Sequence, residues 1–228
     1  MKKFLLLFCL SIILFGCSKE YDGAVTAYEG YQLVKEKMKA EKYVFSAVNL
    51  INLTTLPNTL LSSLPKELEY AHKYGDLTAK MSFSGKDIGK ANFWLYFVNC
   101  NDKYYNVVCA VKDGKPVVDI YPEDLPPLSQ ENLLNKFITL TKENDSPVFA
   151  KKLTESTKFL DDFKAKNDES LAVILFSYIS QYEIADNLRI NETIPYWSAF
   201  MGDDPKISLL LADKNIDKNP VHCVIQNY

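Results

Sequence analysis

Apolar residues recur at helical spacing near the start of the chain and at strand-like spacing soon after. Four of them are separated by four, three and four positions, the buried stripe of an amphipathic helix: Ala27, Tyr31, Val34 and Met38. The segment from Tyr43 to Leu53 is richer in β-branched and aromatic residues and predicts a strand. A short helix is expected over Lys66 to Tyr74, because Pro65 suits a first helical turn and Gly75 ends it.

The middle of the chain carries the strongest strand pattern. Leu77 to Phe83 alternates, and the apolar runs ANFWLYFVN (91–99) and YYNVVCAVK (104–112) flank a short polar turn. An Asp-Gly pair (113–114) then provides the signal of a two-residue hairpin turn before the run VVDIY. Four strands in meander order are therefore expected between residues 77 and 121.

Aromatic residues are concentrated in these strands, and two interpretations of them stay open. The first is cross-strand pairing, which commonly stabilises antiparallel sheets. The second is a ligand groove lined by rings. The residues concerned are Phe93, Trp94, Tyr96, Phe97, Tyr104, Tyr105 and Tyr121.

A break with three prolines at 122–129 precedes a region that we interpret as helical. Ser129 is expected to cap a first helix, and Ser146, followed by Pro147, a second. Asp168 is expected to cap a third helix, whose sequence LAVILFSYI (171–179) is apolar on every side. Because this run is too short to span a bilayer, we interpret it as the central helix of the region.

Two further strands are expected after a loop at 191–206, over Ile207 to Ala212 and Val221 to Gln226. They could rejoin the sheet, which favours one domain over two. The fold class expected is thus α+β: a mainly antiparallel sheet with an N-terminal helix and a helical insertion of about three helices at roughly 129–190. Residues 26–228 would form this single globular domain.

The first residues have the pattern of an export signal. Lys2 and Lys3 precede a run from Phe4 to Phe15 that is apolar apart from Ser11. The run is shorter than the roughly 20 residues of a membrane span and fits the apolar part of a secretion signal. A buried helix would show a polar face, and this segment has none. Residues 1–16 are therefore predicted to be a signal peptide.

The segment ends in LFGC (residues 14–17). These residues resemble the lipobox of bacterial lipoproteins. The resemblance implies that the chain is cut before Cys17, that lipid is attached to this thiol, and that residues 17–25 form a lipidated tether. It thus implies the membrane as a partner, since two or more acyl chains anchor stably. Ser18, where an aspartate would favour the inner membrane, points to the outer membrane, with the domain in the periplasm.

Charge and composition narrow the remaining partners. The whole chain has a net charge of −3, and removal of Lys2 and Lys3 with the signal lowers it to −5. This acidity argues against nucleic acid, which rewards a basic surface. Arg189 is the only arginine in the sequence. A phosphate ligand bound by several guanidinium groups is therefore not expected.

Three cysteines remain once the signal is removed and Cys17 carries lipid: Cys100, Cys109 and Cys223. An exported protein can form disulfides, and Cys100 and Cys109 are the candidate pair because they lie in one predicted hairpin. A tight turn after Cys100 would, however, place it opposite Tyr104, away from Cys109. A bridge and a pair of small buried thiols therefore stay equally open.

No recognisable catalytic, cofactor or metal motif occurs in the sequence. His72 lies on a short helix, and His222 and Cys223 are neighbours on a predicted strand, so they point to opposite faces. We therefore assign no catalytic residue, no cofactor-binding residue and no metal ligand. The carboxylate pairs at 123–124, 161–162 and 203–204 are interpreted as solvated surface.

The sequence favours a lipid-anchored, periplasm-facing binding protein of the bacterial envelope over an enzyme. Its expected partner is a protein, in a toxin-neutralising, exclusion or envelope-assembly role. The alternative is an envelope enzyme that acts on lipid or peptidoglycan with a site assembled from scattered carboxylates.

Overall fold

The computed structural model describes residues 21–43, 49–55, 59–61, 66–100, 103–123, 140–155, 172–179, 194–201, 204–212 and 222–225. The predicted signal peptide, Cys17, Ser129 and Asp168 lie outside these residues.

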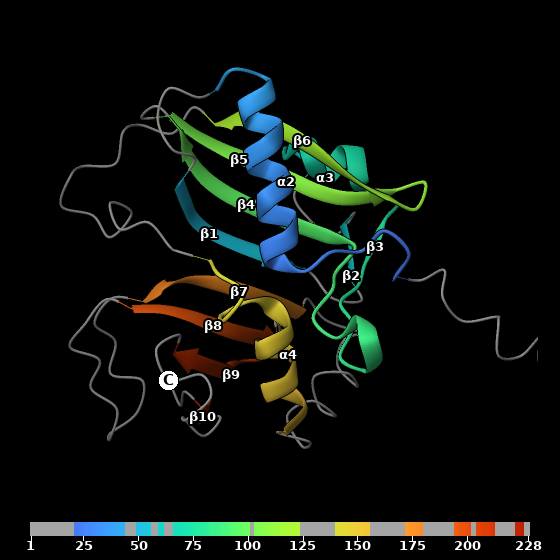
Figure 1. Ribbon diagram of the computed structural model, residues 1–228. Helices are drawn as coiled ribbons and strands as arrows, with labels where there is room; N and C mark the ends of the chain where they lie inside the picture. The colour runs from blue at the N-terminus through green and yellow to red at the C-terminus, as the bar shows by residue number, and fades with distance from the viewer. Residues whose placement is uncertain are drawn as a thin grey trace, which may run out of the picture.

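An antiparallel sheet of eight strands organises the described part of the chain, in the order β10-β9-β8-β7-β1-β4-β5-β6 (Figure 1). Its strands are β1 (Asn49–Thr55), β4 (Phe93–Cys100), β5 (Lys103–Lys112), β6 (Lys115–Glu123), β7 (Ala172–Ile179), β8 (Ile194–Met201), β9 (Asp204–Ala212) and β10 (His222–Ile225). Two short strands, β2 (Thr59–Leu60) and β3 (Thr78–Ala79), pair separately. The helical elements described are α2 (Ala27–Ala40), α3 (Glu69–Tyr74), the 3₁₀ turn η3 (Gly85–Asp87) and α4 (Ser146–Glu155). The fold class is α+β, with a mainly antiparallel sheet.

Helix α2 confirms the predicted N-terminal helix, and its apolar stripe is buried. Tyr31 is 7% exposed, and Val34 and Met38 are fully buried. Helix α3 is also found, but it begins at Glu69, three residues later than predicted, because residues 66–68 form a turn.

The hairpin of β5 and β6 turns where the Asp-Gly pair predicted it. Asp113 and Gly114 have φ values of 52° and 70°, the left-handed conformation that a type I′ hairpin turn requires of both central residues. Lys112 pairs with Lys115 across this turn.

The prediction of a four-strand meander was wrong for its first strand. Only Thr78 and Ala79 of the predicted strand at 77–83 are extended in a ladder, and they pair with β2. The side chain of Asn92 bonds the backbone here: its Nδ2 donates to the oxygen of Thr78 (2.9 Å), and its Oδ1 accepts from the amide of Lys80 (2.7 Å). Because β1 pairs with β4, the sheet continues through a strand from earlier in the chain.

The predicted central helix at 171–179 was also wrong, because residues 172–179 form β7. This strand lies between β1 and β8, inside the sheet. A run that is apolar at every position is expected of a strand covered on both faces as well as of a buried helix. The predicted loop at 191–206 contains β8, whereas β9 and β10 confirm the two strands expected near the end of the chain. Of the helical insertion, α4 is the helix that falls within the described residues.

Helices cover both faces of the β4–β6 part of the sheet. Figure 1 shows α2 lying across one face and α3 behind the other. Side chains alternate accordingly: Trp94, Tyr96 and Val98 pack in the cluster with α2, whereas Phe93 and Leu95 pack in the cluster with α3. The described residues therefore form two apolar cores, one on each face of this part of the sheet.

Candidate functional site

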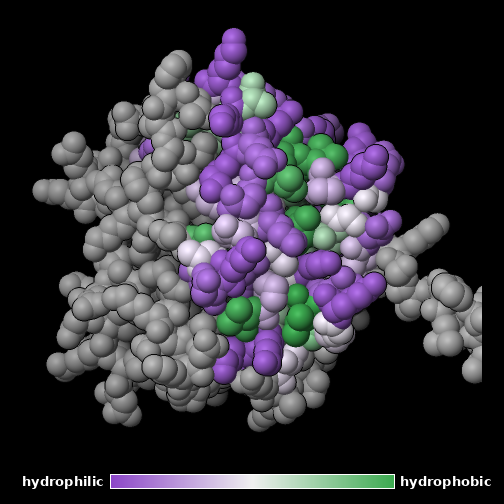
Figure 2. All heavy atoms as spheres, in the orientation of Figure 1, coloured by the Kyte–Doolittle hydropathy of each residue, from purple (hydrophilic) through white to green (hydrophobic). Residues whose placement is uncertain are grey.

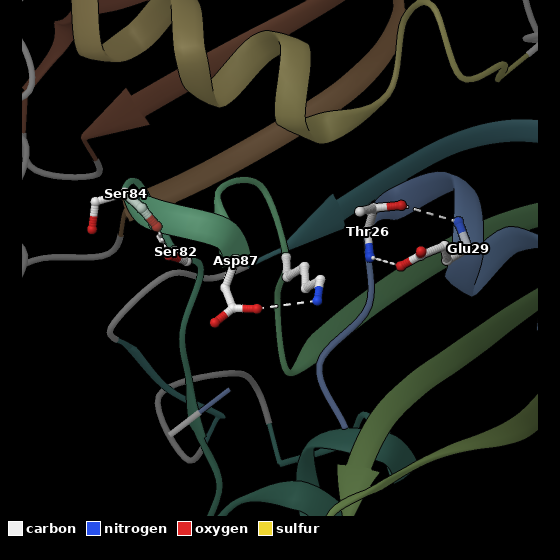
Figure 3. A network of polar contacts seen from close by, with 6 residues as sticks. Thr26, Glu29, Ser82, Ser84 and Asp87 are labelled. Carbon is white, nitrogen blue, oxygen red and sulfur yellow. Dashed lines mark hydrogen bonds and ion pairs between the residues drawn. The ribbon is translucent and has the colours of Figure 1, made fainter. Parts of the chain in front are cut away.

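Four of the buried polar residues described, Thr26, Asn144, Asp145 and Ser146, lie where the first turn of α2 meets α4. Thr26 caps α2 with a capping box: its Oγ1 accepts from the amide of Glu29 (3.2 Å), and the Glu29 carboxylate accepts from the amide of Thr26 (3.0 Å). Figure 3 shows this reciprocal pair, with α4 passing above it. The pattern Thr-x-x-Glu at 26–29 is the signal in the sequence from which this cap could have been predicted.

Two residues from far along the chain complete the same helix end. The amide of Ala27 donates to Ser146 Oγ (2.9 Å), and the amide of Tyr28 donates to Asp145 Oδ1 (2.8 Å). The amide of Gly30 donates to the oxygen of Thr26 (3.0 Å). A helix start leaves four amides without partners in the helix itself. Here the cap and the 145–146 segment bind the first-turn amides of α2.

Ser146 does not play the role that the sequence predicted for it. We expected its hydroxyl to cap its own helix, but this hydroxyl donates to the oxygen of Gly89 (2.6 Å) while it accepts from α2. The backbone oxygen of Asp145 instead accepts from Val148 (3.0 Å), so Asp145 precedes the first turn of α4. Ser146 therefore joins three segments of the chain.

Asp145 is a buried carboxylate, with 7% of its surface exposed. Burial raises its pKa above the ordinary value, because the charged form loses hydration. Hydrogen bonds from Thr26, Tyr28 and Ser146 act in the opposite direction and favour the charged form. Helix N-termini also favour a negative charge. The carboxylate is thus held by contacts within the fold.

The loop from Ser82 to Lys90 packs against this junction. Ser82 Oγ donates to the oxygen of Ser84 (3.0 Å), and Lys90 forms an ion pair with Asp87 (3.1 Å). Figure 3 labels Ser82, Ser84 and Asp87 in this loop. Gly89 has a φ of +78°, and a Cβ there would lie 2.3 Å from the backbone nitrogen of Pro147. Only glycine permits this approach of the loop to α4.

Two buried indole rings lie beneath the junction. Trp94 donates from Nε1 to the oxygen of Val25 (3.0 Å), and Trp197 donates to the oxygen of Asn144 (2.7 Å). The rings meet edge to face at 6.3 Å between centroids, and Phe149 stacks on Trp197 at 5.1 Å. These contacts favour packing over a ligand groove as the role of Trp94.

A second polar cluster lies on the other face of the sheet. The carboxylate of Asp119 accepts hydrogen bonds from Lys73 and from the hydroxyl of Tyr74. Burial opposes the charge on Asp119, but the hydrogen bonds and the charges of Lys73 and Lys37 outweigh it and lower the pKa below the ordinary value. Burial also raises the pKa of Tyr74.

Tyr121, two residues along β6, completes this second cluster. Its ring lies 5.9 Å from that of Tyr70, and its hydroxyl is buried with no hydrogen-bond partner among the described residues. Burial raises the pKa of Tyr121 to about 12, and the charges of Asp119 and Glu69 add to this effect.

Cys100 and Cys109 are buried free thiols. Cys100 pairs with Lys103 and Cys109 with Trp94, which places the two cysteines six positions apart along β4. That spacing corresponds to about 20 Å, and a disulfide requires Cα atoms within about 7 Å. The register therefore forbids the bridge that the sequence left open. Burial raises the pKa of Cys109 to about 12, and Cys100 donates to the oxygen of Tyr43.

The structure separates the other residues that the sequence singled out. His72 is exposed on α3, and His222 pairs with Leu210 at the β10 edge. Glu123 ends β6 and Asp204 begins β9, whereas the pair at 161–162 lies outside the described residues.

Neither a metal cluster nor a membrane-spanning helix is found in the part of the chain that the structure describes. There, no group of three or more His, Cys, Asp or Glu side chains could hold a metal ion. No helix described here is long and apolar enough to cross a bilayer.

Comparison with protein-family models, with curated proteins and with solved structures found no match for this chain. The arrangement of residues is therefore the basis for any functional assignment.

Proposed function

We propose that this protein is a lipid-anchored binding protein of the bacterial envelope, held at the membrane by acylated Cys17. The outer membrane is favoured, and the domain faces the periplasm, where it binds a protein partner. The observation that carries the anchor is LFGC at residues 14–17 after a short apolar run. Tyr21, where the described residues begin, lies four positions beyond Cys17.

The contacts of the two carboxylates Asp145 and Asp119 support a binding role over a catalytic one. Asp145 is engaged by backbone amides of α2 and α4, and Asp119 by Lys73 and Tyr74. A general acid or base must be free to exchange a proton with a bound substrate. Asp145, which joins α2 to α4, and Asp119, which joins α3 to β6, are poorly suited to that task.

The alternative, an enzyme acting on lipid or peptidoglycan, is favoured by one feature. The buried hydroxyl of Tyr121 has no hydrogen-bond partner among the described residues, and it lies two positions from Asp119. An unsatisfied buried polar group is costly and is sometimes retained for function. A substrate group that bonded this hydroxyl would satisfy it.

The anchor is tested by metabolic labelling with a fatty-acid analogue. The wild-type protein should incorporate the label and fractionate with membranes, and Cys17→Ser should do neither. Because serine keeps the size of the side chain, the variant isolates the thiol. Equal labelling of the two proteins would contradict the anchor.

The partner is tested by photo-crosslinking in cells, with the probe at Glu36 or Lys39 on the exposed side of α2. Figure 2 shows hydrophilic residues along this helix. We expect one discrete crosslinked protein, which purified residues 18–228 should bind, and Cys17→Ser should reduce the crosslink in cells because the tether raises local concentration. Binding should persist when His72 and His222 are replaced by alanine. Turnover of a lipid or peptidoglycan substrate without a bound protein would favour the enzyme.

A further inference from the structure

The segment that enters the fold is packed against the turn between β5 and β6. Gly23 has a φ of +77°, and a Cβ there would lie 2.5 Å from the oxygen of Gly114. A Cβ on Gly114 would in turn lie 3.1 Å from Asp22 Oδ2. Residues 22 and 23 therefore touch the hairpin turn. Figure 1 shows the loop before α2 beside this end of the hairpin.

Backbone hydrogen bonds hold this segment in place. Val25 and Ala91 exchange two of them, of 3.2 Å and 2.9 Å, and the amide of Ala24 donates to the oxygen of Tyr21 (3.0 Å). The indole of Trp94 donates to the oxygen of Val25 as well. The chain is thus fixed to the domain from Val25 back to Tyr21.

The length of chain between Cys17 and Tyr21 limits how far this end of the domain can lie from the lipid. Four residues span at most about 14 Å when fully extended. The described part of the domain is larger than that, since β5 alone has ten residues and a length of about 30 Å. Tyr21 therefore stays within about 14 Å of Cys17, whereas the far end of β5 can lie farther from the membrane.

We propose that the tip of the β5–β6 hairpin, residues Lys112 to Lys115, lies against the lipid headgroups of the membrane. This inference rests on the proposed acylation of Cys17. The four residues of the tip are exposed, as is Asp22 beside it. The partner of the hairpin tip is therefore the lipid bilayer itself. β5 runs from Lys112 at the membrane to Lys103, which lies farther from it.

The charges at the tip are compatible with an anionic membrane. Lys112 and Lys115 balance Asp22 and Asp113, so the tip is locally neutral, whereas the chain after removal of the signal carries −5. A negatively charged lipid surface repels the domain as a whole and attracts lysines within about a Debye length. Both lysines have long apolar stems that suit an interface. The tip can thus meet an anionic surface without the repulsion that the net charge of the whole chain implies.

Two lysines of one strand provide a matched test. Lys112 and Lys103 are both exposed and stand at opposite ends of β5. Each is replaced by cysteine in the full lipidated protein, labelled with an environment-sensitive fluorophore, and reconstituted in phosphatidylethanolamine–phosphatidylglycerol vesicles with nitroxide-labelled headgroups. The unsubstituted protein, treated alike, supplies the background from its own thiols. We expect most of the fluorescence at position 112 to be lost and that at position 103 to be retained.

The outcomes separate the inference from the proposed anchor. Protein that floats with the vesicles but is quenched equally at the two positions, or more at 103, would overturn the orientation and leave the anchor standing. Protein that does not float with the vesicles would overturn both. Stronger quenching at 112, abolished in vesicles without nitroxide lipid, would support the orientation.

Discussion

The carboxylate of Asp145 accepts a hydrogen bond from the backbone amide of Tyr28 at 2.8 Å, although 117 positions separate the two residues. The contact places a residue that precedes α4 at the start of α2. Neighbouring Ser146 binds the amide of Ala27 in the same way. The first turn of α2 therefore finds its hydrogen-bond acceptors at the start of α4. The contribution of this junction to stability can be measured.

Replacement of Asp145 by alanine should destabilise the protein by about 1–3 kcal/mol, because it removes the acceptor of the part-buried Tyr28 amide and of the buried Ser146 amide. The free energy of unfolding from urea melts of residues 18–228 would measure this loss. Asp76→Ala is the control, since Asp76 is exposed after α3. Equal losses for the two variants would contradict the role of the junction.

Asp145 and Asp119 should affect the pH dependence of the free energy of unfolding in opposite directions. The folded-state pKa of Asp145 is raised from the ordinary value of 3.8. Its contribution to stability is therefore fully present below pH 3.8 and is lost as the pH rises through the folded-state pKa. Asp145→Asn should remove this decline. Urea melts at a series of pH values from 3 upward, as a rough range around the ordinary carboxyl pKa, would show it as a change of slope.

Asp119 should behave in the reverse sense. Its folded-state pKa is lowered from 3.8, so its contribution is present above that pH and is lost as pH falls through the folded value. Asp119→Asn should therefore reduce stability near neutral pH and flatten the loss in acid. A steeper loss in acid for this variant would contradict the pairing with Lys73 and Tyr74.

Alanine substitutions of Gly89 and Gly85 test how closely the loop packs against α4. Both have positive φ, of 78° and 66°, but a Cβ on Gly89 would meet Pro147 at 2.3 Å, whereas a Cβ on Gly85 has nothing within 4 Å. Gly85→Ala should cost about 1–2 kcal/mol from the backbone conformation alone. Gly89→Ala should cost clearly more in urea melts, because Pro147 must also move. Equal costs would show that the loop yields without strain.

Replacement of Trp197 by phenylalanine should destabilise the protein by about 1–3 kcal/mol, because the buried oxygen of Asn144 loses the indole donor. The variant should also weaken the near-ultraviolet circular dichroism that arises from the edge-to-face pair with Trp94. Tyr104→Phe, on the half-buried start of β5, is a control for removal of a polar aromatic group. An unchanged spectrum would contradict the ring geometry.

Several parts of the fold could be predicted from local sequence. The stripe through Tyr31, Val34 and Met38 identified α2, and the Asp-Gly pair at 113–114 identified the hairpin. Thr26 and Glu29 carry the capping-box pattern that places the first residue of α2. Each signal depends on contacts between residues a few positions apart, which a single sequence displays directly.

The sequence by itself determined the elements whose buried face has a clear period and whose turns need particular residues, and it supplied the pattern on which the anchor at Cys17 is proposed. Tertiary structure alone decided that residues 172–179 are a strand and that β1 lies beside β4. It also decided that Asp145 and Ser146 serve α2, and that Cys100 and Cys109 stay apart. An evenly apolar run has no period from which helix and strand can be told apart, and pairing between distant segments depends on which neighbour buries each face.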